Sequence, residues 1–147
     1  MRWWSTRRLA LVAALTFGLA AGLGAFTFVY ARGYSYLTND PAACANCHVM
    51  REHFDAWNKS THRAVATCND CHTPHNIVGK YTVKAKNGFW HSFYFTTGRY
   101  PDPLRITEGN RKVTLGTCEY CHQQIAHSLG PTTNCVRCHQ YVGHYVR

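Results

Sequence analysis

Beyond one apolar stretch near its start, the sequence has few of the features on which a small domain usually depends. Its 147 residues include only two methionines, so that Met50 is the sole one after the initiator, and only 7 acidic residues against 16 basic ones. The segments between its cysteines are mostly polar, with Gly, Asn, Thr and Pro scattered through them. A domain this small, with so little aliphatic sequence, cannot rely on a large side-chain core. Something other than packed aliphatic residues must hold it together.

The apolar stretch is a candidate membrane anchor. Leu9 to Tyr30 contains 22 residues without a charge. At about 1.5 Å per residue, a helix of this length spans the roughly 30 Å hydrocarbon layer of a bilayer. The residues before it are basic or aromatic: Arg2, Trp3, Trp4, Arg7 and Arg8. The positive-inside bias therefore predicts a single-pass protein of the bacterial inner membrane, with a cytoplasmic N-terminus.

Two domains are expected on this basis, a cytoplasmic tip with its transmembrane helix in residues 1–32 and a periplasmic domain in residues 33–147. The alternative is a cleaved signal peptide, since Ala20-Ala21-Gly22 offers small residues for cutting. The apolar run is longer than the roughly 7 to 15 residues of a usual signal, which favours an anchor. Gly18 and Gly22 form a GxxxG pattern that can pair two membrane helices, although glycine is also common in such helices without pairing.

All eight cysteines belong to four Cys-x-x-Cys-His motifs. The motifs consist of Cys44, Cys47 and His48; Cys68, Cys71 and His72; Cys118, Cys121 and His122; and Cys135, Cys138 and His139. Disulfides do not explain the histidines, and zinc explains the paired cysteines but not a histidine directly after every pair. Covalent c-type haem explains both, because two thiols attach one ring and the next residue binds its iron. The sequence therefore predicts four covalently bound c-type haems.

Four haems in a domain of about 115 residues would themselves form its core. We therefore expect a mainly α fold with much irregular chain: one N-terminal transmembrane helix plus a small multihaem c-type cytochrome domain organised around four covalent haems. The haem propionates would also offset most of the formal net charge of +9. The basic composition then does not indicate a nucleic-acid partner.

Each iron takes a second axial ligand, and six histidines lie outside the motifs. The third and fourth motifs are each followed by another histidine five residues after the motif histidine, His127 and His144. A histidine so close in sequence cannot reach the opposite face of the same ring, so both are predicted to bind irons of other motifs. His62, six residues before the second motif, is the next candidate. His53 and His75 have no such repeat behind them and are predicted to be solvated or hydrogen-bonding residues.

Met50 follows His48 by two residues, so the two side chains cannot clamp one iron from opposite sides. Three interpretations remain open at this point. Met50 replaces His48 on the near face of its own haem, serves a different haem, or only packs. A thioether ligand would raise the reduction potential of its haem.

Taken together, the anchor, the four motifs, Met50 and the spacing from Trp57 to His62 resemble the NapC/NirT family of tetrahaem quinol dehydrogenases. At this length the chain is most similar to the NrfH branch, the membrane partners of pentahaem cytochrome c nitrite reductase. The resemblance implies that Met50 binds the first haem and leaves His48 free to hydrogen-bond, with quinol on the far side of that haem. The other ligands that it implies are His72, His122 and His139, with His62, His127 and His144 as distal donors. In some members of this branch one haem takes a lysine from the partner instead.

The quinol pocket of this family carries a lysine and, seven residues later, an aspartate. Lys84 and Gly88 match that pattern, but His91 stands at the acidic position. His91 has three interpretations: it accepts the quinol protons, it binds the first iron opposite Met50, or it is structural. Seven aromatic residues between positions 76 and 100 favour a quinol site, because a quinone ring requires an apolar wall with a few polar groups.

The resemblance therefore implies a quinol dehydrogenase that oxidises menaquinol or ubiquinol at the first haem, with the lipid bilayer as its surroundings. Electrons would pass through the haems to a periplasmic multihaem reductase, with pentahaem nitrite reductase as the expected partner. The alternatives are another reductase such as nitrate reductase, reverse operation as a quinone reductase, or an electron-shuttling anchor whose quinol is handled by a separate subunit.

Overall fold

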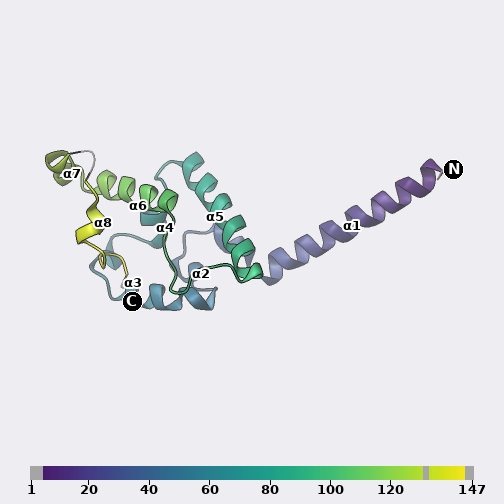
Figure 1. The fold of residues 1–147 in the computed structure, drawn as a ribbon, viewed down its shortest axis with the longest axis horizontal. Helices are drawn as coiled ribbons and strands as arrows, with labels where there is room; N and C mark the ends of the chain where they lie inside the picture. Colours follow the sequence, from purple (N-terminus) through teal and green to yellow (C-terminus); the bar gives the residue numbers. More distant parts are fainter. Residues whose placement is uncertain (1–4, 131–132, 145–147) are drawn as a thin grey trace. The chain divides into compact units, whose positions relative to one another are not determined.

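The computed structural model describes residues 5–130 and 133–144, and in these residues the chain is helical without any strand (Figure 1). Arg2, Trp3 and Trp4 lie outside the described residues. The helices are α1 Thr6–Tyr30, η1 Gly33–Leu37, α2 Pro41–Cys44, η2 His48–Met50, α3 Arg51–Asn58, η3 Thr61–Ala64, α4 Cys68–His72, α5 Ile77–Thr97, α6 Glu108–Cys121, α7 Gln123–Leu129 and α8 Cys135–Cys138. Irregular segments join most of them, and the longest of these in the described part of the chain covers residues 98–107. The mainly α fold with much irregular chain is confirmed.

Helix α1 belongs to the first of two units, Met1–Tyr34, and the second unit is Ser35–Arg147. The helix has 25 residues, its most apolar 18-residue window has a mean hydropathy of 2.1, and none of the side chains in that window is buried. By length and composition it is long enough to cross a membrane. It begins three residues before the predicted apolar run and ends with it at Tyr30.

The second unit has no apolar core within the described residues. No aliphatic or aromatic side chain there is buried, and the three buried residues are Thr73, Lys84 and Thr117. Thr117 on α6 donates a hydrogen bond to the carbonyl oxygen of Cys71 on α4, at 3.0 Å between the oxygens. This contact ties together two neighbouring helices that carry the second and third motifs (Figure 1).

All four motifs lie on or beside short helical segments. The first runs from the end of α2 to the start of η2, the second forms α4, the third ends α6, and the fourth forms α8. Thr67 and Asp70 close a capping box at the start of α4, with the Thr67 backbone N–H 2.8 Å from Asp70 Oδ2. Such a box satisfies donors that a short helix would otherwise leave unpaired. The second motif is therefore held in a helical turn, whereas the first spans the turn between α2 and η2.

Helix α5 is the longest element of the second unit. Asn76 caps its start by accepting a hydrogen bond from the backbone N–H of Gly79, at 2.7 Å. It ends at Gly98, whose φ of 66° lies in the left-handed region that glycine adopts without strain. Asn76 and Gly98 thus mark the two ends of α5. The helix also carries six of the seven aromatic residues between positions 76 and 100.

Candidate functional site

One face of α5 carries the residues of the predicted quinol site. Lys84, Gly88, His91 and Phe95 follow one another at helical spacings of three or four residues, which places them along one side of the helix. Each of them contacts the segment 36–48, which contains the first motif. The structure therefore brings Lys84 and His91 together beside this motif.

Lys84 is buried, with only 6% of its surface exposed. Its Nζ donates to the carbonyl oxygen of Thr38 at 2.6 Å and to Oδ1 of Asn39 at 3.3 Å. Burial lowers the pKa of Lys84, and the positive charge of Lys80 lowers it further. An ammonium group has three N–H donors. Two of them hold the loop before α2, and one remains for a ligand.

His91 is bound through one of its two ring nitrogens. Its Nδ1 lies 3.0 Å from the hydroxyl oxygen of Tyr36, which is 55 positions away in the sequence. Burial lowers the pKa of His91, so the imidazole is neutral at neutral pH. Burial also raises the pKa of Tyr36 to about 12, with the nearby thiols of Cys47 and Cys44 adding to the shift. Only Nε2 of His91 is left for other chemistry.

Met50 and His48 share a single turn of 3₁₀ helix, η2. Residues two apart on a helix do not face the same side. The His48 ring is exposed and meets Phe95 of α5 edge-on, with 6.2 Å between the ring centroids, whereas Met50 is half-buried. His48 and Met50 thus differ in exposure, and that they cannot hold one iron from opposite sides stays a prediction.

The thiols of successive motifs lie close to one another. A hydrogen bond between the thiols of Cys44 and Cys68 lowers the pKa of Cys44 to about 7 and raises that of Cys68. Burial raises the pKa of Cys71, and the neighbouring Cys118 adds to that shift. Cys118 in turn lies near Cys135 and has its pKa raised, chiefly by burial. The attachment points of the four motifs thus form a series in chain order.

Two pairs of histidines bring a predicted distal ligand against a motif histidine. The rings of His62 and His122 have centroids 6.2 Å apart, and those of His72 and His144 are 5.9 Å apart and nearly parallel, at 12°. Metal–nitrogen bonds of about 2 Å would place two imidazoles on opposite sides of one ion with centroids roughly 6 Å apart. Both pairs have the spacing that two axial ligands of one iron require.

The fourth motif shows no such pair. His139 and His127 are both exposed, and neither has a ring partner within residues 5–130 and 133–144. His75 is also exposed and stacks on Tyr120, with 4.1 Å between centroids. That His127 binds the iron of another motif therefore remains a prediction.

A model of the NapC/NirT cytochrome c family, N-terminal region, matches residues 4–113 of the chain. That match covers most of the chain and includes the first two motifs, the face of α5 and most of α6 before the third motif. The chain belongs to this family. With the family shown, covalent c-type haem is the group that the cysteine pairs hold.

NapC/NirT relatives cover most of the chain. It is 37% identical to the cytochrome c-type protein NrfH of Wolinella succinogenes over 128 residues, which are 86% of this chain and 71% of that protein. It is 31% identical to the cytochrome c nitrite reductase subunit NrfH of Nitratidesulfovibrio vulgaris, over 86% of this chain and 80% of the relative. A crystal structure of the cytochrome c nitrite reductase NrfHA complex bound to the HQNO inhibitor contains a similar chain. The TM-score is 0.63 and the identity 28%, over 91% of this chain and 88% of that one.

The residues of this NapC/NirT chain fit covalent haem on independent grounds. The second unit has no buried apolar side chain in its described part, as expected for a domain built around large planar cofactors. The Nδ1 atoms of His53 and His144 are buried without a hydrogen-bond partner. Buried polar atoms are normally satisfied, so these orphans indicate a missing partner. The apolar helix α1 is that of a single-pass protein of the inner membrane.

Sequence reasoning missed two residues near these sites. Tyr36 carries no motif, and only the fold shows that it binds His91. His53 was predicted to be solvated or hydrogen-bonded, but its buried Nδ1 has no partner and its ring lies 4.9 Å from that of His144. The prediction for His53 was wrong at this nitrogen, because His144 lies against the His53 ring. No signal in the sequence pairs these two positions.

Proposed function

We propose that the chain is a membrane-anchored tetrahaem quinol dehydrogenase that delivers electrons to a periplasmic cytochrome c nitrite reductase. The observation that carries the proposal is the convergence of Lys84 and His91 beside the first motif. It is supported by the match to a nitrite reductase subunit along 80% of that relative's length. The first finding provides a site at which quinol would be oxidised, and the second indicates a nitrite reductase that would receive the electrons.

The proposed haem ligands follow the predicted set. Met50 would hold the first iron, with His48 left to hydrogen-bond, and His72, His122 and His139 would hold the other three from the motif side. His144 would complete the second site and His62 the third, on the spacing of their rings. His127 would complete the fourth. When bound, c-type haem supplies one-electron transfer, and a thioether ligand raises the potential of its site relative to imidazole.

In the proposed quinol site, each polar residue has a separate task. Lys84 would donate its remaining N–H to a quinol oxygen, held in place by its bonds to Thr38 and Asn39. His91 would accept a quinol proton at Nε2, since Nδ1 is already bound to Tyr36. A neutral imidazole of lowered pKa suits this task because it is unprotonated at neutral pH.

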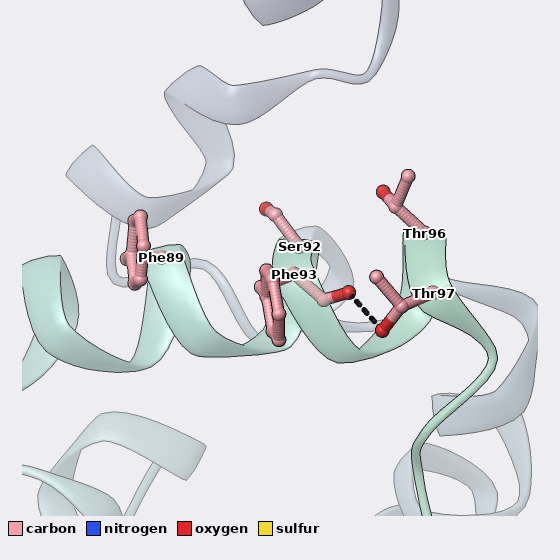
Figure 2. A pocket seen from close by; sticks show the side chains of 5 residues that line it. All are labelled: Phe89, Ser92, Phe93, Thr96 and Thr97. Carbon is pink, nitrogen blue, oxygen red and sulfur yellow. Dashed lines mark hydrogen bonds between the residues drawn. The ribbon is translucent and has the colours of Figure 1, made fainter.

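An apolar surface for the quinol lies on the same helix. Phe89, Ser92, Phe93, Thr96 and Thr97 line an open hollow of about 450 Å³ in the second half of α5 (Figure 2). Thr97 does not offer its hydroxyl to this hollow as a free donor, because Oγ1 donates to the Phe93 carbonyl oxygen at 2.8 Å. The lining is therefore largely apolar, as a lipid-soluble quinol and its bilayer require. Its lining residues lie on another side of α5 than Lys84 and His91, so we assign this hollow to the hydrophobic tail of the quinol and not to its ring.

The proposed orientation follows from the charges that flank the anchor. Arg7 and Arg8 lie in the first turn of α1, and no acidic residue accompanies them there. The positive-inside bias places this end in the cytoplasm and residues 33–147 in the periplasm. Only five residues separate the end of α1 at Tyr30 from Tyr36 of the site, so the quinol site follows the anchor directly.

Reconstitution tests the function and separates the partners. The full chain is placed in liposomes with menaquinol, and purified cytochrome c nitrite reductase is added with nitrite outside. We expect nitrite consumption that depends on the chain and on quinol together. Nitrate consumption with periplasmic nitrate reductase, in place of nitrite consumption, would favour the other reductase as partner. Haem oxidation by added quinone would favour the reverse direction.

A further inference from the structure

Tyr36 is fixed on two sides within the second unit. Its hydroxyl lies 3.0 Å from His91 Nδ1, and its ring lies against Gly88, one helical turn before His91 on α5. A Cβ at Gly88 would meet the nearest atoms of the Tyr36 ring at 3.5 Å, which is ordinary van der Waals contact. The Tyr36 ring therefore packs against the backbone of α5 at Gly88, and its hydroxyl lies beside the His91 ring.

This contact occupies Nδ1 of His91 and leaves Nε2 as the nitrogen that can react. A neutral imidazole has one nitrogen that donates and one that accepts, and the partner of the first sets the role of the second. For Nε2 to accept a proton it must carry a lone pair, so the hydrogen must be on Nδ1. Nδ1–H then donates to the Tyr36 hydroxyl oxygen, which the 3.0 Å distance allows.

The same contact stabilises the product of proton transfer. Once Nε2 is protonated, His91 is a cation, and its Nδ1–H bond to Tyr36 becomes charge-assisted. Such bonds are roughly twice as strong as those between neutral groups. The raised pKa of Tyr36, about 12, keeps the phenol neutral over the working range, so its own O–H remains available to donate onward.

We propose that Tyr36 is the positioning residue of His91, holding Nδ1 so that Nε2 receives the quinol proton. This inference rests on the proposed function. In the step, the quinol O–H bond breaks and its electron pair stays on the oxygen, giving a quinolate. An Nε2–H bond forms, and the imidazolium later gives this proton to water on the periplasmic side. Tyr36 touches neither the quinol nor the reacting oxygen and acts only through His91.

The test is a double-mutant cycle on the full-length protein with all its haems, assayed with a menaquinol analogue. Tyr36→Phe keeps the ring on Gly88 and removes only the hydroxyl. Loss of a partner that orients a functional histidine typically costs about 10- to 100-fold in activity. We expect kcat to fall by about that factor and KM to change by less than about 3-fold. Tyr34→Phe is the matched control, and we expect it to leave both constants unchanged.

The second arm of the cycle uses variants of His91. Tyr36→Phe should change kcat by less than about 2-fold when it is added to His91→Ala, because residues that act through one another are not additive. Tyr36→Phe should also change kcat little when it is added to His91→Asp, because a carboxylate has no tautomer that a hydrogen-bond partner must fix. Equal losses in all backgrounds, or a Tyr36→Phe variant as active as the wild type, would overturn the role of Tyr36.

Haem absorption spectra and haem content check that each variant is intact. If Tyr36→Phe fails to assemble, Tyr36→His, which retains a hydrogen-bonding group, replaces it and should keep more activity than Tyr36→Leu. Equal activity of these two variants would overturn the proposal. Wild-type protein that cannot oxidise the quinol would overturn the proposed function itself. If the wild-type protein oxidises the quinol but the losses of Tyr36→Phe and His91→Ala add up in the double variant, only the inference about Tyr36 is overturned.

Discussion

His72 and His144 face each other with nearly parallel rings, 5.9 Å between centroids and 12° between planes. His72 belongs to the second motif and His144 follows the fourth motif. The contact therefore joins two parts of the domain that are far apart in the sequence. Burial, together with the nearby His144 and His53, lowers the pKa of His72 to about 4. Neutral imidazole is the form that binds a metal. This pair therefore links the C-terminal segment to the second haem site.

Replacing His144 tests that link. His144→Ala should convert one haem from low-spin to high-spin, because the iron loses an axial imidazole. His62→Ala should do the same at a different haem. Electron paramagnetic resonance of the oxidised protein resolves the two cases. His75→Ala is the matched control, since His75 is exposed and stacks only on Tyr120, and it should leave every signal in place. Unchanged signals in His144→Ala would contradict the assignment.

Met50 should determine the potential of one haem. Met50→His replaces a thioether by an imidazole, so we expect the midpoint potential of a single haem to fall, as measured by a redox titration followed optically. His48→Ala should leave that haem attached and its potential nearly unchanged, because in the proposed ligand set Met50 holds that iron and His48, which contacts Phe95, does not. A large shift in His48→Ala with none in Met50→His would reverse the two roles.

The pH dependence of quinol oxidation should report His91. The reactive form is the neutral imidazole, and burial lowers the pKa of His91 below its usual 6.5. The rate should therefore hold at neutral pH and fall as the pH drops through this lowered value. His91→Asp should move the acid limb to still lower pH, because a carboxylate stays unprotonated there. The measurement is kcat/KM against pH, and an identical acid limb in both proteins would exclude His91 as the acceptor.

Lys84 should affect quinol binding more than its exposed neighbour does. Lys84→Met removes the remaining donor and also the bonds to Thr38 and Asn39. We expect KM for the quinol to rise by about tenfold, equivalent to about 1.4 kcal/mol, with a small loss of thermal stability. Lys86→Met removes an exposed charge from the same helix and should change neither value. Equal effects in both variants would contradict a specific role for Lys84.

The sequence predicted the features that depend on local spacing. Cys-x-x-Cys-His repeats identified the haem sites, and the uncharged run predicted α1. The contacts that arrange the site have no such signature. Lys84 binds the carbonyl oxygen of Thr38, and any residue type carries that acceptor. Without an apolar core in the described part of the second unit, periodicity also cannot tell which segments meet.

For the histidines too, local spacing predicted a role, but only the fold shows which residues meet. The repeated spacing of His127 and His144 predicted that both serve irons of other motifs, but it could not choose which. The fold pairs His144 with His72, and it brings His53 into the same cluster. These contacts depend on how the chain returns after the fourth motif, which is a property of the assembled domain. The place of His91 likewise became informative only through its bond to Tyr36.

The most direct test of quinol oxidation is a mixing experiment with the purified full-length protein and no other subunit. The oxidised protein is mixed with a reduced menaquinol analogue, and the visible absorption of the haems is followed in time. The account predicts that the haems become reduced at a rate that rises with quinol concentration and is lowered in Lys84→Met. Haems that stay oxidised until another subunit is added would contradict it.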